Sequence, residues 1–435
     1  MVACKAAPDR TLSLTFNASG EQFIEKKSIK RPLAWLIWGL AVSYGVYKDQ
    51  TQSSYAVLNA DIAESLSLTL LQVGELGAVY AITYAVMTIP AGGLLDRYGA
   101  RMILSAGVAI VAAGALIFGL ADSAAVIITG QALMGIGGAF GYPGLAYLTR
   151  YWFDIRHFGL VFGVAQTVAA TANTLGQAAV GYLILVMAWQ DIMLLEALAG
   201  FLLMIAFLML VREPGDSTAE PVNSGAHPPF WAGLWRDLKV LSVRPLFWQV
   251  TLISGLTFGL MLGVGIIWGI KLLIFKGFDP TSASNINATI WFGFGTGALL
   301  VHVLSDYVRS FKLTCVIFLV CDLIALLLFI LLSDISTGVA YALFLSIGFF
   351  AGVSPMCYTM TTRFCEKARA GTAFGLLTCV SFVIGALLMP APARLIEDFN
   401  VPLSAAALIF PAALMLALIL AVIKKETYHM EPAEA

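Results

Sequence analysis

Charge is scarce in this sequence of 435 residues: Asp, Glu, Lys and Arg together account for 12% of it. A soluble globular protein carries about 25% charged residues. Hydrophobic residues make up 60% of the chain and the mean hydropathy is +0.88, which is more apolar surface than a soluble core can bury. The composition therefore excludes an ordinary soluble protein and predicts a helical protein that crosses a membrane many times.

Several chemical motifs are also missing. The sequence has no zinc-ligand spacing, no glycine-rich phosphate loop, no nucleophile elbow and no basic block, so it predicts no metal, no cofactor, no enzyme and no nucleic-acid partner. The six cysteines show no paired extracellular spacing, which gives no sign of a disulfide. The polar start of the chain lacks the shape of a signal peptide, so we expect the first apolar run to act as an uncleaved targeting signal.

What the sequence does contain is a series of apolar runs of about 20 residues, the length at which a helix crosses a bilayer. We place twelve of them at 33–59, 70–91, 102–121, 124–149, 159–186, 192–211, 246–274, 284–305, 313–332, 338–362, 371–395 and 403–423. The longest interruption, 212–245, is rich in proline and predicts a linker. Within it, 231–241 is expected to form an amphipathic helix at the membrane surface.

The chain thus divides into five parts. These are a tail (1–32), a six-helix bundle (33–211), the linker (212–245), a second six-helix bundle (246–423) and a second tail (424–435). With the N-terminus inside, about 21 Lys and Arg residues lie on the inner side and about two, Lys276 and Arg394, on the outer side. This asymmetry predicts that both termini and the linker are cytoplasmic.

The two halves repeat one another. The stretch Gly92 to Arg101 follows the second span, and a worn copy, Leu304 to Arg309, follows the eighth. The openings of spans five and eleven, Gly159 to Gly163 and Gly371 to Gly375, form a second pair. Both pairs are offset by about 210 residues, which predicts two parallel bundles with a site between them near the middle of the membrane.

The stretch Gly92 to Arg101 resembles the signature loop of the major facilitator superfamily, and the spans, linker and repeat extend that resemblance over nearly the whole chain. The resemblance implies an all-α membrane fold of twelve transmembrane helices in two pseudo-symmetric six-helix bundles, and secondary active transport by rocking around a central cavity. Tyr151 to Phe153 and Gln166-Thr167 look, more loosely, like the bacterial nutrient-uptake branch. That implies a multi-pass protein of the bacterial inner membrane.

The resemblance also implies a charge latch at the cytoplasmic mouth. Its residues would be Asp96, Arg97 and Arg101 with Asp306 and Arg309 from the second half. The alternative is that these charges only satisfy the positive-inside rule.

The sequence departs from some branches of that family. Gln131 stands where many members carry an arginine in span four, and span five lacks the Gly-Pro typical of drug/proton antiporters. The repeat places the span-seven mate of Lys48 near Phe258 to Leu260, which is apolar. A basic clamp for phosphate, shared between the two halves, is therefore not expected.

The most informative stretch is Tyr44 to Gln50, because it places Lys48 and Asp49 deep inside the first span. A charged side chain at bilayer depth costs roughly 2.5–3.5 kcal/mol if it faces lipid, so both should face a polar interior. Lys48 is the candidate contact for an anion; the alternative is a structural partner for an acid elsewhere. Asp49 is turned about 100° from Lys48, so we expect each to find its own partner. Asp49 is the candidate carrier of a coupling proton; the alternative is a fixed salt bridge.

Other polar residues extend this candidate site. Tyr44, Tyr47 and Thr51 share the helix face of Lys48. From later spans we add Gln166, Asn173, Trp268, Lys271, Asn287, Trp291 and Tyr358. The alternatives are polar contacts between helices and, for Lys271, a side chain that reaches the membrane surface. Glu75 and Glu196 are expected simply to reach water.

Together these features predict proton-coupled uptake of a small polar solute with a carboxylate: an organic acid, an amino acid or a carboxylate siderophore. We expect a monomer in the lipid bilayer, with the solute and protons as its partners. The alternatives are an exchanger or efflux carrier of the same fold, or a receptor that does not transport.

Overall fold

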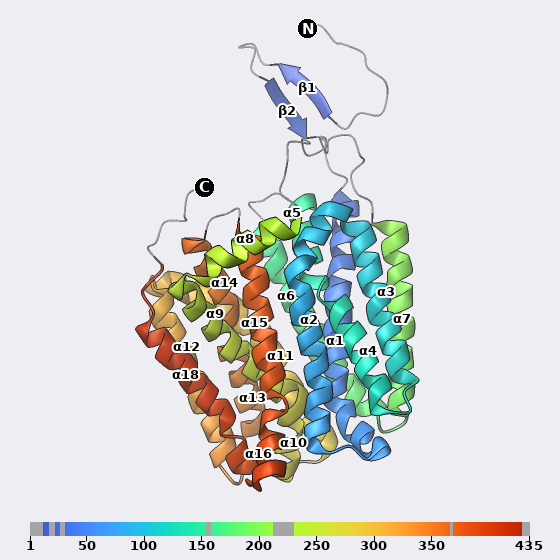
Figure 1. Ribbon diagram of the computed structural model, residues 1–435, viewed down its shortest axis with the longest axis vertical. Helices are drawn as coiled ribbons and strands as arrows, with labels where there is room; N and C mark the ends of the chain where they lie inside the picture. Colours follow the sequence, from blue (N-terminus) through green and yellow to red (C-terminus); the bar gives the residue numbers. More distant parts are fainter. Residues whose placement is uncertain are drawn as a thin grey trace.

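The computed structural model describes residues 12–16, 22–26, 31–153, 158–211, 230–365 and 369–428. Nearly all of them are helical, and the long helices run up and down through one body (Figure 1). Outside this body, β1 (Leu12–Phe16) pairs antiparallel with β2 (Gln22–Lys26). The period-two alternation in Leu-Ser-Leu-Thr-Phe is typical of a strand, and this hairpin was not predicted.

The first half holds six membrane-length segments. They are α1 (Arg31–Leu66), α2 (Leu70–Tyr98), α3 (Ala100–Gly119), α4 (Ala124–Gly138) continued by α5 (Gly141–Trp152), α6 (Phe158–Leu183) and α7 (Trp189–Leu210). The helix predicted inside the linker is present as α8 (Phe230–Ser242).

The second half holds six more. They are α9 (Pro245–Leu262) continued by the π-helix η2 (Gly263–Trp268) and α10 (Gly269–Phe275), α11 (Pro280–Val308), α12 (Phe311–Leu331), α13 (Thr337–Ala351) continued by α14 (Val353–Phe364), α15 (Ala370–Leu388) continued by α16 (Ala391–Phe399), and α17 (Leu403–Ala406) continued by α18 (Ile409–Ile423). The twelve predicted spans are confirmed, and most of their ends move by only a few residues.

Within the described residues, ten segments are long and apolar enough to cross a membrane by composition alone. The two remaining segments are α1 and α6, whose polar side chains lower their hydropathy: Lys48, Asp49 and Gln50 in α1, and Asn173 and Gln177 in α6. These two helices pack against each other. The least hydrophobic helices therefore lie side by side, where each shields the other's polar groups from lipid.

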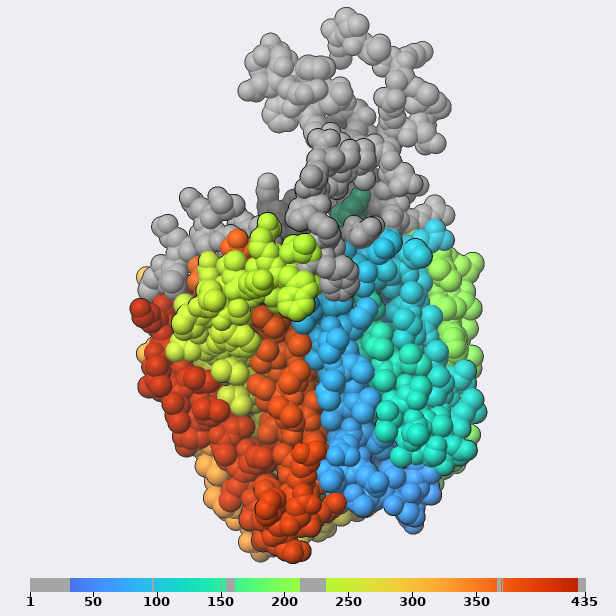
Figure 2. All heavy atoms as spheres, viewed as in Figure 1, coloured from blue at the N-terminus to red at the C-terminus, as the bar shows by residue number. Residues whose placement is uncertain are grey.

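The two halves form neighbouring bundles that meet along a seam. Helix α2 packs against α15, and α6 packs against α11. Figure 2 shows the first of these contacts on the surface, with orange α15 alongside blue α2. Inside the first bundle α3 packs closely on α4, and a Cβ on Gly130 would lie 2.8 Å from the carbonyl oxygen of Gly114. Glycines at this contact therefore let the two helices approach closely.

Three spans are interrupted near the middle of the molecule, and one of these is the tenth, which breaks between α13 and α14. The fourth span breaks between α4 and α5, and Pro143 lies in the first turn of α5, where its missing N–H costs no hydrogen bond. In the seventh span, the wide turn of η2 is supported by asparagine side chains. Asn287 Nδ2 donates to the Gly265 carbonyl at 2.8 Å, and Asn59 Nδ2 donates to the Ile266 carbonyl at 3.4 Å. π-helical turns are frequent at functional sites.

Candidate functional site

The centre of the first bundle holds an ion pair between neighbours in the sequence. The ammonium of Lys48 contacts Asp49 Oδ1 directly. This corrects the expectation that each would find its own partner. The two Cα–Cβ directions do diverge on the helix, but the long lysine side chain curls back to reach the next residue. The attraction between the two opposite charges offsets part of the cost of burying them at membrane depth.

The pair is buried but not closed on every side. Lys48 is 1% exposed, whereas the Asp49 side chain keeps 18% of its surface. The ion pair is therefore open to water on the side of Asp49.

Tyr142 of α5 completes this group. Its hydroxyl donates to Asp49 Oδ2 at 2.6 Å, and its ring centroid lies 4.1 Å from Lys48 Nζ. Tyr84 of α2 presents a second ring, with its centroid 5.3 Å from the same nitrogen. Aromatic faces attract cations at these distances, so the ammonium is held by one carboxylate and two rings.

The break between α4 and α5 makes room for this arrangement. A Cβ placed on Gly141 would come within 2.9 Å of Lys48 Cδ. The glycine therefore lets the lysine stem lie against the backbone of α5. The next residue, Tyr142, then faces the charged ends of Lys48 and Asp49.

The second bundle presents a different surface to this group. Tyr84 stacks on Phe382 of α15, with centroids 4.1 Å apart, and Phe382 lies 5.4 Å from Phe258 of α9. Phe294 of α11 follows, 5.6 Å from Phe258. The charges thus lie on one side of the seam and apolar rings on the other, as the apolar mate of Lys48 predicted.

Three residues predicted to share the face of Lys48 direct their polar atoms away from the ion pair. The Tyr44 hydroxyl donates to the Gly137 carbonyl at 2.6 Å, and Thr51 Oγ1 donates to the Lys48 carbonyl at 3.0 Å. Tyr47 points toward α7, where a Cβ on Gly200 would lie 2.2 Å from its hydroxyl oxygen. The structure does not bring these three groups to the ion pair.

In α6, Asn173 Oδ1 accepts a hydrogen bond from Ser53 at 2.5 Å. Gln166 lies on the same helix, and within the described residues its Oε1 is buried without a partner. Trp291 Nε1 of α11 donates to Gln177 Oε1 at 2.7 Å and so links the two bundles. These residues lie along the contact between α1, α6 and α11.

The remaining predicted residues lie in the second bundle. Trp268 Nε1 donates to the Met389 carbonyl at 2.8 Å, and the Tyr358 hydroxyl lies 2.8 Å from Thr378 Oγ1. Asn287 supports η2, as described above. Lys271 is half-buried in α10.

Of the residues predicted to form the charge latch, the side chains of Asp96 and Arg97 lie outside the described part of the structure. Arg101 donates to the Leu208 carbonyl at 2.5 Å, and Asp306 accepts from the Tyr428 hydroxyl at 3.3 Å. Arg309 ends α11 in a left-handed conformation with φ 53°.

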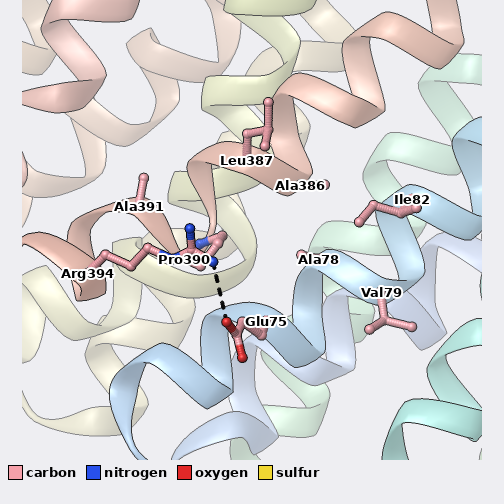
Figure 3. Close-up of a pocket in the computed structure, with 9 residues that line it drawn as sticks. All are labelled: Glu75, Ala78, Val79, Ile82, Ala386, Leu387, Pro390, Ala391 and Arg394. Atoms are coloured by element: carbon pink, nitrogen blue, oxygen red, sulfur yellow. Dashed lines mark hydrogen bonds and ion pairs between the residues drawn. The ribbon is translucent and has the colours of Figure 1, made fainter. Parts of the chain in front are cut away.

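At the end of the molecule away from the termini, polar contacts cross the seam. Glu75 of α2 forms an ion pair with Arg394 of α16 at 3.5 Å, and the Leu71 amide donates to Glu397 at 2.8 Å. Figure 3 shows the Glu75–Arg394 pair beside a cavity of about 280 Å³ between α2 and the junction of α15 with α16. These contacts hold the two bundles together at this end.

Tyr84 and Tyr142 were not predicted as site residues. Tyr142 was visible only as part of the glycine- and proline-rich stretch of span four, and its approach to Asp49 depends on the helix break. For metal binding, no three His, Cys, Asp or Glu side chains in the described part of the chain lie close enough together to hold an ion.

Two six-helix bundles of apolar helices, with an ion pair buried in the first of them, define a multi-pass helical membrane protein. The model of the Major Facilitator Superfamily matches residues 40–390, and the chain belongs to that family. This confirms the resemblance predicted from the loop after the second span.

Solved structures of this family have the same fold. A bacterial homologue of the human lysosomal transporter Spinster, in an inward-facing and unoccupied conformation, matches with a TM-score of 0.65 and 18% identity, over 91% of this chain and 96% of that one. A mutant of the nucleoside transporter NupG matches with a TM-score of 0.73 and 13% identity, over 89% and 99%.

Curated relatives fall into two groups by name. A probable L-galactonate transporter of Escherichia coli K12 is 25% identical over 261 residues, 58% of this chain and 56% of that protein. A methylenomycin A resistance protein of Bacillus subtilis 168 is 29% identical over 164 residues, 37% of this chain and 35% of that protein. The alignments thus span roughly a third to a half of these relatives' lengths.

Proposed function

We propose that this protein is a secondary active transporter of a bacterial inner membrane, with both termini cytoplasmic, that takes up a small organic acid together with protons. The observation that carries the proposal is the Lys48 ammonium, buried at the seam and held by Asp49, Tyr142 and Tyr84. A buried charge in a membrane helix marks a substrate or ion pathway more often than a structural contact.

The chemistry of this group suits a carboxylate. An ammonium offers three N–H donors and no acceptor, and Asp49 takes one of them. A carboxylate that enters beside Asp49 takes another, while the Tyr142 hydroxyl is close enough to turn toward it. The carbon body of the solute then lies toward the rings of Phe382 and Phe258.

The named relatives support an acid as the solute. Besides the L-galactonate transporter, a probable galactarate/D-glucarate transporter of Escherichia coli K12 is 19% identical over 171 residues. These names belong to the relatives. Among the acids predicted from the sequence, they favour sugar acids over amino acids and siderophores.

Exchange or export is the second candidate function. The methylenomycin A resistance protein and a tetracenomycin C resistance and export protein of Streptomyces glaucescens are also similar to this chain. Both modes use the same fold and the same site, and they differ in whether a proton gradient drives accumulation.

The test is transport by the purified protein in liposomes, with L-galactonate, galactarate and D-glucarate as labelled solutes. We expect accumulation of at least one of them when the outside is acidic, and little without the gradient. Lys48→Ala should abolish it, and Lys425→Ala, which removes a lysine from the tail, should not. Exchange that needs solute on both sides, with no accumulation when the outside is acidic, would establish the second candidate, and normal transport by Lys48→Ala would refute the site.

A further inference from the structure

A second acidic group lies inside the first bundle, away from the ion pair. Glu196 of α7 points at α1, where Ser54 Oγ donates to its Oε1. Gln50, which donates to Ser54 Oγ, belongs to the same cluster. The expectation that Glu196 simply reaches water is therefore wrong, because the other carboxyl oxygen, Oε2, is buried within the protein.

In this cluster, the buried hydrogen-bond acceptors outnumber the donors that reach them. Gln50 Nε2 donates to Ser54 Oγ at 3.0 Å, and Ser54 donates onward to Glu196. Among the described residues, Glu196 Oε2 and Gln50 Oε1 are left as buried acceptors without a donor, and the neighbouring Tyr47 hydroxyl also has no partner. Buried polar atoms are rarely left unpaired. One proton on the carboxyl turns an unpaired acceptor into a donor and removes the mismatch.

The charged residues around Glu196 also favour a protonated carboxyl. Helix α7 packs on α1 and α3. On α1 the nearest charges, Lys48 and Asp49, are paired with each other, and on α3 the charged residue is Arg101, which donates to the Leu208 carbonyl. In the part of the chain that the structure describes, no ion pair includes Glu196. An ionised carboxylate without a cation is costly inside a membrane.

We propose that Glu196 is the proton-carrying site of the transporter, and that it rather than Asp49 binds and releases the coupling proton. The inference rests on the proposed function. The proton comes from water on the side that is open, binds Glu196 Oε2, and leaves to water after the bundles have rocked. No other bond forms or breaks.

Helix α1 connects this site to the ion pair. Lys48 and Ser54 are six residues apart on α1, or about 9 Å along the axis. Between them Gln50 lies against α6, where a Cβ on Gly176 would lie 1.8 Å from its Oε1, and Ser53 bonds Asn173. A shift of α1 against α6 when a solute binds at Lys48 therefore also moves Gln50 and Ser54 relative to Glu196.

Asp322 of α12 provides a matched comparison. It is 0% exposed, and both of its oxygens lack a partner among the described residues. Unlike Glu196, it has no hydroxyl or amide donating to it there, and it lies outside the seam. We assign it no proton-carrying role, so a variant at this position controls for the loss of any buried carboxyl.

The test compares Glu196→Gln, Ser54→Ala and Asp322→Asn in the full-length protein. Infrared spectra in lipid nanodiscs, taken across a pH series, should show a protonated carboxyl band that titrates in the wild type and in Asp322→Asn. The double variant Glu196→Gln, Asp322→Asn should lack this band, and Ser54→Ala in the Asp322→Asn background should shift the pH at which it disappears. The same band in the double variant would overturn the assignment without any transport measurement.

Transport then separates this inference from the proposed function. With L-galactonate as the probe, Glu196→Gln should lose accumulation driven by protons but keep exchange across the membrane, which also shows that it folds. Proton-driven accumulation by Glu196→Gln would overturn the role of Glu196 alone. A wild-type protein that never responds to a proton gradient would instead overturn the proposed coupling.

Discussion

Tyr84 in the first bundle lies on Phe382 in the second, with ring centroids 4.1 Å apart and the ring planes 22° from parallel. The Tyr84 ring also faces the Lys48 ammonium, and the Phe382 ring also contacts Phe258. The two rings therefore mark where the bundles meet at the level of the proposed site. Under the proposed function, we expect a solute that binds beside Lys48 to displace part of this contact and so to move the two bundles.

The ion pair makes the first prediction. Lys48→Met leaves Asp49 buried without its cation, and breaking a buried pair in this way costs about 3–5 kcal/mol. We expect a clear drop in melting temperature and no uptake of L-galactonate. The double variant Lys48→Met, Asp49→Asn should recover the melting temperature but not the uptake. Uptake by the double variant at the wild-type rate would show that neither charge binds the solute.

Two substitutions at Tyr142 separate the effects of its two contacts. Tyr142→Phe removes the hydrogen bond to Asp49 but keeps the ring beside Lys48, whereas Tyr142→Leu removes both. A hydrogen bond to a charged group is worth about 1.5–3 kcal/mol, so we expect Tyr142→Phe to raise KM by about tenfold or more. Tyr142→Leu should be worse. Equal defects in the two variants would mean that the ring contributes nothing.

The end of the molecule away from the termini depends on a close backbone contact. A Cβ on Gly74 would lie 2.7 Å from Pro390 Cα and 2.9 Å from the Met389 carbonyl oxygen. Gly74→Ala should therefore push α2 away from α16 and destabilise this closed arrangement by about 1–3 kcal/mol. Distances between spin labels on the two helices should lengthen.

Gly39→Ala is the control for that experiment. A Cβ on Gly39 meets nothing within 4 Å, and alanine is the better helix former. The control should keep the wild-type distances. Unchanged distances in Gly74→Ala would show that this contact does not hold the ends together.

The second tail makes a prediction about pH. Glu426 accepts hydrogen bonds from Ser310 and from the amides of Phe311 and Lys312 at the start of α12. Burial acts to raise the pKa of Glu426, but the hydrogen bonds from Ser310 and from the backbone amides outweigh it and lower the pKa below 4.5. The carboxylate also suits the positive end of the helix dipole. Its contribution is therefore present above about pH 4.5 and is lost as the pH falls through the lower folded pKa.

Glu426→Gln should thus destabilise the protein at pH 7 by about 0.5–1 kcal/mol, a modest amount because the group is partly exposed. The difference between variant and wild type should shrink in acid. Thermal unfolding at pH 7 and pH 4 checks this, with the exposed Glu64→Gln as the control for a lost charge. A gap that widens in acid would contradict the assigned role.

The apolar side of the seam makes a prediction about the solute. Lys48 is the one cation that the described residues place at the Tyr84–Phe382 contact, and the facing side chains are phenylalanines. A second carboxylate on the solute would lie against these rings without a partner, which is costly. We expect L-galactonate to be preferred over galactarate by about tenfold or more in kcat/KM. Equal values would mean that the second carboxylate finds a cation elsewhere.

The sequence was sufficient for the architecture because bilayer thickness and charge asymmetry constrain long apolar runs strongly. It also identified Lys48 and Asp49, since ions inside an apolar run have few explanations. Their pairing was missed because helix geometry fixes where Cβ atoms point but not how a flexible lysine side chain folds back. Tyr142 depended on a backbone break that residue patterns do not locate.

Glu196 shows the same limit from another direction. Its position near the outer end of its span suggested contact with water, yet the side chain turns inward to Ser54. Which way a helix rotates in a bundle depends on all of its neighbours. Polar residues such as Trp268 and Asn287 were likewise predicted as ligands, while the structure uses them to satisfy backbone carbonyls.

Lys48 and Asp49 together carry no net charge, and this affects how the transport cycle responds to membrane voltage. A carrier moves net charge through the electric field of the membrane only if its loaded and empty forms differ in charge, and each elementary charge is worth about 2.3 kcal/mol per 100 mV. Here the pair contributes nothing, and under the proposed coupling of one monovalent acid to one proton, the two cross as an uncharged unit. Voltage set by a potassium gradient and valinomycin should therefore leave the rate of accumulation unchanged.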